Sequence, residues 1–219
     1  MTGSSSLSEI AERIASATGG FTGGGAHRFE EIGRFSLQSL QENGMVPDSR
    51  VLDLGCGTLR LGYWLIRFLD ADRYFGLEPA KKFVDAGLKY AIGPELEAAK
   101  RPRFHYARDF DFSVFGVKFD FVVARSIFSH AAPDMVRAAM DSFRDTGTPG
   151  AVMLASYKPG KKVDGDADEV NVGGKGDWSL RRYRREFLYG LARERGLAAD
   201  DFGKIVNGQI WLRLRKGTG

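Results

Sequence analysis

The sequence predicts an α/β fold, a doubly wound and mostly parallel sheet with helices on both faces, and two observations carry that prediction. Short apolar runs alternate with segments of helical periodicity between residues 51 and 156, as a parallel α/β sheet requires. The stretch RVLDLGCGTLRLG, Arg50 to Gly62, is typical of a buried strand, a glycine turn and the start of a helix.

Two helices are expected before the first strand. The segment from Leu7 to Ala17 is amphipathic, and a glycine-rich break from Gly19 to Gly25 follows it. Phe29 to Glu42 carries apolar residues at helical spacing. Together they predict an N-terminal helical cap, residues 1–45, before a main domain of residues 46–219 within one compact chain.

The elements of the main domain follow in alternation. The expected strands are Val51–Leu54, Tyr74–Leu77, Arg103–Ala107, Phe119–Ala124 and Ala151–Ser156. The expected helices are Leu59–Leu69, Lys81–Tyr90, Asp134–Phe143 and Leu180–Arg195, with an extra helical turn at Pro94 to Lys100. Lys158 to Asp177 is predicted to be a long loop that is either a mobile lid or disordered.

Composition indicates a soluble globular protein. Hydrophobic residues make up 43% and charged residues 27% of the 219 residues. The single cysteine, Cys56, allows no internal disulfide. The N-terminus shows no basic start followed by an apolar run, and no stretch of transmembrane length lacks charges. We therefore expect a cytoplasmic enzyme.

The charge pattern raises the question of nucleic-acid binding. The net charge is +4 and the sequence pI is near 9.2, with six arginines between Leu180 and Arg195. In that predicted helix Tyr183, Phe187, Leu188 and Leu191 form an apolar stripe, which favours a surface helix packed on a sheet with a solvated basic face. Nucleic acid is thus disfavoured as a partner but remains an alternative.

The glycine turn indicates a nucleotide-binding device. Glycines let backbone N–H groups approach a ligand closely, but no Lys-Ser/Thr pair follows them, as a phosphate-binding P-loop would need. The second strand ends at Glu78, about 25 residues after Asp53. A carboxylate there can accept hydrogen bonds from both ribose hydroxyls, which is compatible with NAD. The alternative for Glu78 is a solvated carboxylate that caps the helix beginning near Ala80.

The segment LDLGCG resembles motif I of the class I S-adenosylmethionine-dependent methyltransferases, which usually reads D/E-x-G-x-G-x-G. In this sequence Leu59 stands in place of the third glycine. The stretches DFDFSVFG and FDFVVARSIFSH resemble bacterial small-molecule methyltransferases, and the likeness runs from about Phe29 onward. The resemblance implies a Rossmann-like seven-stranded sheet. It also implies a closing antiparallel pair, Asp201–Val206 with Gln209–Arg215.

The resemblance implies S-adenosyl-L-methionine as the cofactor. In the family, an acidic residue after the third strand accepts a hydrogen bond from the adenine amino group, and a neighbouring apolar side chain packs on the ring. Asp109 and Phe110 match these two roles. Asp111 is a rival acceptor. Arg60, with Arg34, is expected to bracket the methionine carboxylate. The full expected set is Asp53, Gly55, Cys56, Gly57, Arg60, Glu78, Pro79, Asp109, Phe110, Arg125 and Ser126.

Methyl transfer to a hydroxyl gains from a base that removes its proton. His130 follows the fourth strand, where the methyl group must be delivered, and imidazole is the side chain best suited to proton transfer near neutral pH. Its alternative is a hydrogen bond near the start of the next helix. Tyr157 and His27 are secondary catalytic candidates, while His105 within a strand is expected to be structural.

Absences narrow the reaction. The segment after strand four is ARSIF, not the N/D-P-P-Y/F signature of amino-group methylation, and no Asp, Asn and His cluster for a metal appears there. We therefore expect metal-independent O-methylation of a small polar metabolite or sugar-type acceptor. An RNA- or protein-modifying methyltransferase and a non-catalytic cofactor-binding protein remain alternatives.

Overall fold

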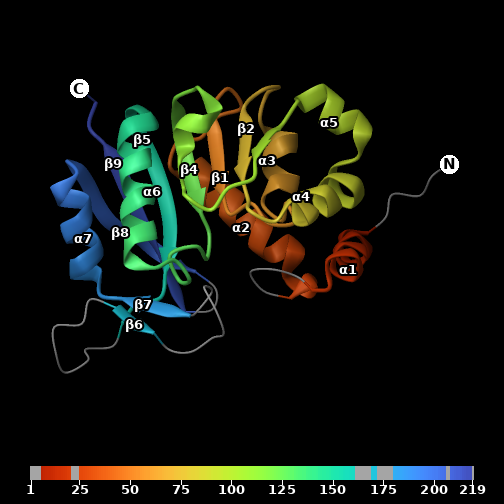
Figure 1. Ribbon diagram of the computed structural model, residues 1–219. Helices are drawn as coiled ribbons and strands as arrows, with labels where there is room; N and C mark the ends of the chain where they lie inside the picture. Colours follow the sequence, from red (N-terminus) through yellow and green to blue (C-terminus); the bar gives the residue numbers. More distant parts are fainter. Residues whose placement is uncertain (1–5, 21–24, 161–168, 172–179, 206–207, 219) are drawn as a thin grey trace. The chain divides into compact units, whose positions relative to one another are not determined.

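The structure is a computed structural model and describes residues 6–20, 25–160, 169–171, 180–205 and 208–218 (Figure 1). The chain divides into two compact units, Met1–Arg108 and Asp109–Gly219. The expected division into a cap of residues 1–45 and a domain of residues 46–219 stays a prediction. In the described part of the chain, no helix combines the length and apolar character needed to cross a membrane.

The first unit is built on a parallel sheet of three strands. Its order is β3-β2-β1, with β1 at Val51–Leu54, β2 at Tyr74–Leu77 and β3 at Arg103–His105. Every residue of β1 and β2 is buried, as continuous apolar runs in a parallel sheet should be. The helices that connect or follow these strands are α3 (Gly62–Phe68), α4 (Lys81–Gly87), its π-helical continuation η2 (Leu88–Ile92) and α5 (Pro94–Lys100).

The N-terminal helices are part of the same unit. Helix α1 (Leu7–Thr18) begins with a capping box between Ser6 and Glu9 and ends at left-handed Gly19. A short 3-10 helix, η1 (Ala26–Arg28), leads into α2 (Phe29–Glu42). The apolar face of α1 packs beside α4 and η2 (Figure 1), in a cluster whose buried members are Ala11, Ile14, Phe29, Ala86 and Ala91.

Helix α3 starts later than the sequence predicts. The expected helix Leu59–Leu69 begins only at Gly62, and Thr58 to Leu61 form turns. The reason is that Leu59 has a φ of 60°, a left-handed conformation that an α-helix does not accommodate. The third strand is also shorter than predicted, since it ends at His105 and not at Ala107.

The second unit holds four sheet strands in the order β4-β5-β9-β8. They are β4 (Phe119–Ala124), β5 (Gly147–Tyr157), β8 (Leu197–Ile205) and β9 (Gln209–Lys216). β4 and β5 are parallel, whereas β9 is antiparallel to β5 and β8, so the predicted closing antiparallel pair is confirmed. The 3-10 helix η3 (Phe112–Phe115) precedes β4, and α6 (Pro133–Thr146) connects β4 to β5 (Figure 1).

The predicted helix Leu180–Arg195 is wrong in its first turn. Arg181–Tyr183 form strand β7, paired antiparallel with β6 (Glu169–Asn171), and only Arg185–Glu194 form helix α7. Tyr183 also donates its backbone N–H to the Lys158 carbonyl, a bond that a helix would not allow. The lid predicted over Lys158 to Asp177 falls mostly outside the described residues.

The two units together supply the seven strands that the sequence analysis expects. Among these seven strands, all neighbouring pairs within each unit are parallel except those that involve β9. The predicted fold class, a Rossmann-like and mostly parallel seven-stranded sheet with helices, is confirmed.

Candidate cofactor and catalytic site

The glycine turn follows β1 directly and is anchored to the end of β2. Gly55 and Gly57 have φ values of 70° and 53°, which residues with a side chain rarely adopt. The backbone N–H groups of Gly55 and Cys56 donate to the Leu77 carbonyl, over 2.7 Å and 3.3 Å. The ends of two neighbouring strands therefore hold the turn in place.

Glu78 directly follows β2, and its side chain contacts the glycine turn. It is only 8% exposed. Its Oε2 accepts the Gly57 N–H at 3.1 Å, and its Oε1 accepts the Ala80 N–H at 3.0 Å. Burial raises the pKa of the Glu78 carboxyl, while the two backbone donors and the charge of Arg108 lower it. The side chain is thus no solvated helix cap, although it does bind the backbone where α4 begins.

The Glu78 carboxylate fits a ribose. Each carboxylate oxygen can accept two hydrogen bonds, and the two backbone donors use one position on each. Two hydroxyl donors would satisfy the remaining positions of this buried group, which burial would otherwise leave without the hydrogen bonds of water. The remaining acceptor positions of the Glu78 carboxylate and the glycine turn therefore fit the nucleoside part of the cofactor.

Asp53 is buried beneath the turn and faces Tyr74. The Tyr74 hydroxyl donates to Asp53 Oδ2 at 3.0 Å, and the two residues are 2% and 4% exposed. Burial raises the pKa of Asp53 to about 7, against the lowering effect of the Tyr74 hydrogen bond. The contact joins β1 to β2, so Asp53 shapes the turn from below.

Cys56 is a buried free thiol. Burial, with the nearby charges of Asp53 and Glu78, raises its pKa well above the usual value, so the nucleophilic thiolate is disfavoured. Cys56 is therefore a small buried residue of the glycine turn and not a nucleophile.

The two arginines expected at the methionine carboxylate differ in their surroundings. Arg60 is 7% exposed, and its Nη2 donates to the Gly25 carbonyl at 3.3 Å. Arg34 is exposed on α2, pairs with Glu30 at 3.1 Å and lies over the Trp64 ring. The contacts favour Arg60 for the site and a surface role for Arg34.

The remaining predicted residues of the first unit flank the turn. Pro79 directly follows Glu78 and is partly buried. His27 is exposed on η1, beside the Gly25 backbone that Arg60 contacts.

The second unit carries the residues expected at the adenine. Asp109 is exposed, and its Oδ1 accepts the Asp111 N–H at 3.2 Å. Asp111 instead caps η3, with its Oδ1 accepting from the N–H and hydroxyl of Ser113. Phe110 between them has a φ of 56° and is 5% exposed. The cap on η3 therefore favours Asp109 over Asp111 as the adenine acceptor.

The turn after β4 carries Arg125, Ser126 and His130. Arg125 and His130 are half-buried, and Ser126 has a left-handed backbone with a φ of 59°. The His130 N–H donates to the Ile127 carbonyl at 2.9 Å, one turn before α6. His130 is thus fixed by its backbone in a tight turn, and its Nδ1 atom is buried.

Tyr157 is poorly suited to act as a base. Its hydroxyl donates to Asp201 Oδ1 at 3.1 Å, and its side chain is 1% exposed. Burial and the Asp201 charge raise the pKa of Tyr157 above its ordinary value. The geometry assigns Tyr157 to the link between β5 and β8.

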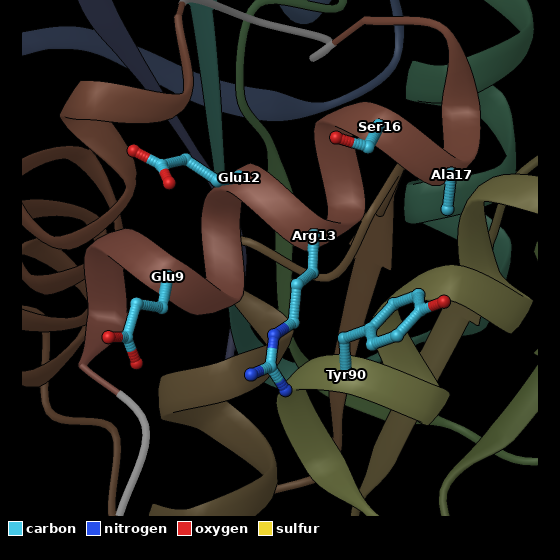
Figure 2. Close-up of a pocket in the computed structure, with 6 residues that line it drawn as sticks. All are labelled: Glu9, Glu12, Arg13, Ser16, Ala17 and Tyr90. Carbon is cyan, nitrogen blue, oxygen red and sulfur yellow. The ribbon is translucent and has the colours of Figure 1, made fainter.

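A surface hollow of about 560 Å³ lies between α1 and η2. Figure 2 shows Arg13 of α1 extending toward Tyr90 of η2. The remaining lining residues are Glu9, Glu12, Ser16 and Ala17, so none of the predicted site residues lines this hollow. Over the described residues, no group of three or more His, Cys, Asp or Glu side chains is placed to hold a metal ion.

Sequence reasoning missed three residues that the structure brings to these turns. Tyr74 binds Asp53, while Ser156 and Gln209 both bind Ser126. Each is a residue with a polar group in or at the end of a strand, which is the one signal that could have found them.

Comparisons with known proteins agree with this fold. Residues 52–153 match the family model described as a methyltransferase domain. Magnesium protoporphyrin IX methyltransferase from Synechocystis, solved with S-adenosylmethionine, is similar at a TM-score of 0.65 and 13% identity, over 99% of this chain and 100% of that one. An amino pentose methyltransferase of calicheamicin biosynthesis from Micromonospora echinaspora, also bound to S-adenosylmethionine, gives 0.62 and 17%, over 99% of each chain.

A third solved structure is a glycopeptide N-methyltransferase, with a TM-score of 0.62 and 15% identity over 84% of this chain and 90% of that one. These likenesses concern the fold, and the matched domain spans the glycine turn, Glu78 and the turn after β4. Residues 52–153 thus match a methyltransferase domain, and the chain shares its fold with solved methyltransferases that bind S-adenosylmethionine.

Proposed function

We propose that this chain is a class I S-adenosylmethionine-dependent methyltransferase that methylates a hydroxyl of a small polar acceptor, of the sugar or sugar-derived class, with His130 as the general base. The observation that carries the proposal is the place of His130 in the turn that follows β4, the half-buried turn that also bears Arg125 and Ser126. The amino pentose methyltransferase with the same fold supports a small sugar-type acceptor.

The proposed cofactor contacts are the residues that the sequence predicts. Glu78 accepts the ribose hydroxyls, Gly55 and Gly57 let the backbone approach, and Arg60 pairs with the methionine carboxylate. Cys56 and Pro79 complete the wall of the turn, with Asp53 beneath it. Asp109 and Phe110 contact the adenine, and Arg125 and Ser126 border the donor methyl group.

The reaction is an in-line displacement. Glu78, Arg60 and the glycine turn would hold S-adenosylmethionine, which would supply an activated methyl group that passes from sulfur to the acceptor oxygen. The chain's own task is to align the acceptor oxygen with the methyl carbon. An imidazole nitrogen of His130 takes the hydroxyl proton as the new bond forms.

The test is His130→Ala, assayed with labelled S-adenosylmethionine and a metabolite extract from the protein's own cells. Loss of a general base should lower turnover by about 10²–10⁴-fold while the affinity for S-adenosylhomocysteine stays nearly unchanged. His27→Ala tests the secondary candidate, which is exposed on η1, and it should retain turnover if His130 is the base. Normal turnover in His130→Ala would remove the base from the mechanism, and a methylated amine as product would refute O-methylation.

A further inference from the structure

A closed ring of hydrogen bonds holds the turn after β4. The Ser126 N–H donates to Ser156 Oγ at 2.6 Å, the Ser156 hydroxyl donates to Gln209 Oε1 at 2.6 Å, and Gln209 Nε2 donates to Ser126 Oγ at 3.0 Å. Ser156 is fully buried and Gln209 is 4% exposed. The ring joins the end of β4 to the end of β5 and the start of β9.

The ring acts on a residue with an unusual backbone. Ser126 has a φ of 59°, a conformation that residues with a Cβ rarely adopt. Such residues persist only where their surroundings determine the conformation, and they concentrate at functional sites. Here the ring binds both the backbone N–H and the side-chain oxygen of Ser126, so the left-handed conformation is held from two sides.

The same turn leads to His130 through further contacts. The Ser129 hydroxyl donates to the Ser126 carbonyl at 3.1 Å, and the His130 N–H donates to the Ile127 carbonyl at 2.9 Å. The carbonyls on both sides of His130 are bound by β7. The Arg181 N–H donates to Ser129 O at 2.8 Å, and the Tyr183 hydroxyl donates to Ala131 O at 2.6 Å.

We propose that Ser156 and Gln209 are positioning residues that fix left-handed Ser126 and thereby set the orientation of the His130 imidazole. The catalytic meaning of this orientation rests on the proposed function of His130, whereas the positioning itself does not. A buried network whose members are all satisfied can specify one local geometry. The alternative is that the ring only stabilises the fold.

The experiment distinguishes a positioning role of the ring from a role in fold stability alone, by testing whether a second substitution restores what breaking the ring removes. Gln209→Leu and Ser156→Ala each break the ring, and Ser126→Gly supplies a residue that adopts a positive φ without strain. Thr148→Val is the matched control. The Thr148 hydroxyl donates to Asp120 Oδ1 at 3.0 Å, likewise between β5 and β4, but near the start of both strands and away from the His130 turn.

The first readout is the NMR titration of the histidine Cε1–H signals in the full chain. The chain has three histidines, so His27→Gln and His105→Gln assign them. Gln209→Leu should shift or broaden the His130 signal and leave the other two unchanged. Ser126→Gly in the same chain should restore it, and Thr148→Val should leave it unaltered. If Gln209→Leu fails to fold, Ser156→Ala with and without Ser126→Gly gives the same comparison.

The second readout is methyl transfer from labelled S-adenosylmethionine to the cell extract. Misplacing a catalytic group by about 1 Å can cost about 10²-fold in rate, so ring-breaking variants should lose about 10- to 100-fold in turnover at unchanged affinity for S-adenosylhomocysteine, whereas Thr148→Val should keep the turnover of the wild type. An unchanged His130 signal in both ring variants, or failure of Ser126→Gly to restore it, would overturn the positioning role. Normal turnover in His130→Ala would refute the role of His130 as general base but would leave the positioning role of Ser156 and Gln209 standing.

Discussion

Leu59 stands where related glycine motifs have their third glycine, and it still adopts the left-handed conformation that a glycine would supply, with a φ of 60°. Its side chain is fully buried. A Cβ added at Gly62 or Gly87 would come within about 3 Å of Leu59 side-chain atoms. Leu59 therefore fills a space that those two glycines leave open, at the cost of a strained backbone.

Leu59→Ala should lower the free energy of unfolding by about 2–5 kcal/mol, because the buried side chain is lost and the strain stays. Leu59→Gly should lower it by about 1 kcal/mol less, since glycine relieves the left-handed strain. Urea unfolding measures both. The control is Leu65, buried inside helical α3, where glycine should be worse than alanine. The same order of stability at both positions would contradict the strain at Leu59.

Asp53 should make stability depend on pH. Its pKa is raised from the usual 3.8 to about 7 in the folded protein, chiefly by burial. Between these values the folded state holds a proton that the unfolded state has released, so the free energy of unfolding falls as pH rises from about 4 to about 7.

Asp53→Asn should remove this fall, so the stability of the wild type relative to Asp53→Asn should decrease by roughly 1–4 kcal/mol between pH 4 and pH 8. The measurement is chemical unfolding of both proteins without cofactor across that range. Asp72→Asn is the control, because Arg101 lowers the pKa of this exposed carboxyl. A pH-independent difference between wild type and Asp53→Asn would show that Asp53 is charged in the folded state.

At the scale of elements, α2 and α3 approach closely at one glycine. A Cβ added at Gly33 would lie 2.8 Å from the Arg60 backbone oxygen and would also meet the Trp64 ring. Trp64 belongs to α3, and Arg60 precedes it as the arginine proposed at the methionine carboxylate. The fit of α2 against this segment thus bears on the cofactor site.

Gly33→Ala should lower the free energy of unfolding by about 1–3 kcal/mol through overpacking. Gly190→Ala is the matched control inside helix α7, where an added Cβ meets nothing within 4 Å. It should raise the free energy of unfolding by about 0.5–1 kcal/mol, because alanine is the better helix former. Thermal unfolding of the two variants gives the sign, and equal signs would refute the close contact at Gly33.

The sequence was sufficient for elements whose signal is local. The buried strands β1, β2 and β4 have the predicted bounds because apolar runs and the turns beside them define both ends. Strand β7 was missed because the pairing that forms it is not local in sequence. Tyr183 keeps the apolar spacing of α7 and stacks on Phe187, but its backbone pairs with β6 and Lys158.

The same distinction holds for the candidate site. The glycine turn and Glu78 follow from motif and strand order, whereas the Tyr74 bond to Asp53 spans 21 residues and the Gln209 bond to Ser126 spans 83. No spacing rule connects residues so far apart. Polar partners of this kind become visible only when the strands are placed side by side.

At the scale of the whole molecule, part of the positive charge between Leu180 and Arg195 lies beside carboxylates. Arg195 binds Asp141 at 3.0 Å, Arg185 lies 3.9 Å from Asp201, and Arg182 donates to the Pro159 carbonyl. Paired arginines are poorly disposed to neutralise phosphates, so the arginine-rich segment favours the surface interpretation over nucleic-acid binding.

Fluorescence anisotropy with a labelled single-stranded RNA should accordingly show binding no tighter than about 100 µM at physiological salt, the weak end of non-specific binding. Micromolar binding that weakens steeply between about 50 and 200 mM salt would show that the basic surface contacts phosphates. Arg193→Ala with Arg182→Ala would then locate that surface.

The central claim is that the Glu78 carboxylate, held in the glycine turn, binds the ribose of the methyl donor. Calorimetric titration with S-adenosylhomocysteine tests it most directly. Wild type should release heat on binding, and Glu78→Ala should lose about 2–4 kcal/mol of binding free energy, the value of two hydrogen bonds to a buried charge. Glu95→Ala, exposed on α5, should bind like wild type. Absence of binding by wild type, or unchanged affinity in a folded Glu78→Ala protein, would contradict the account.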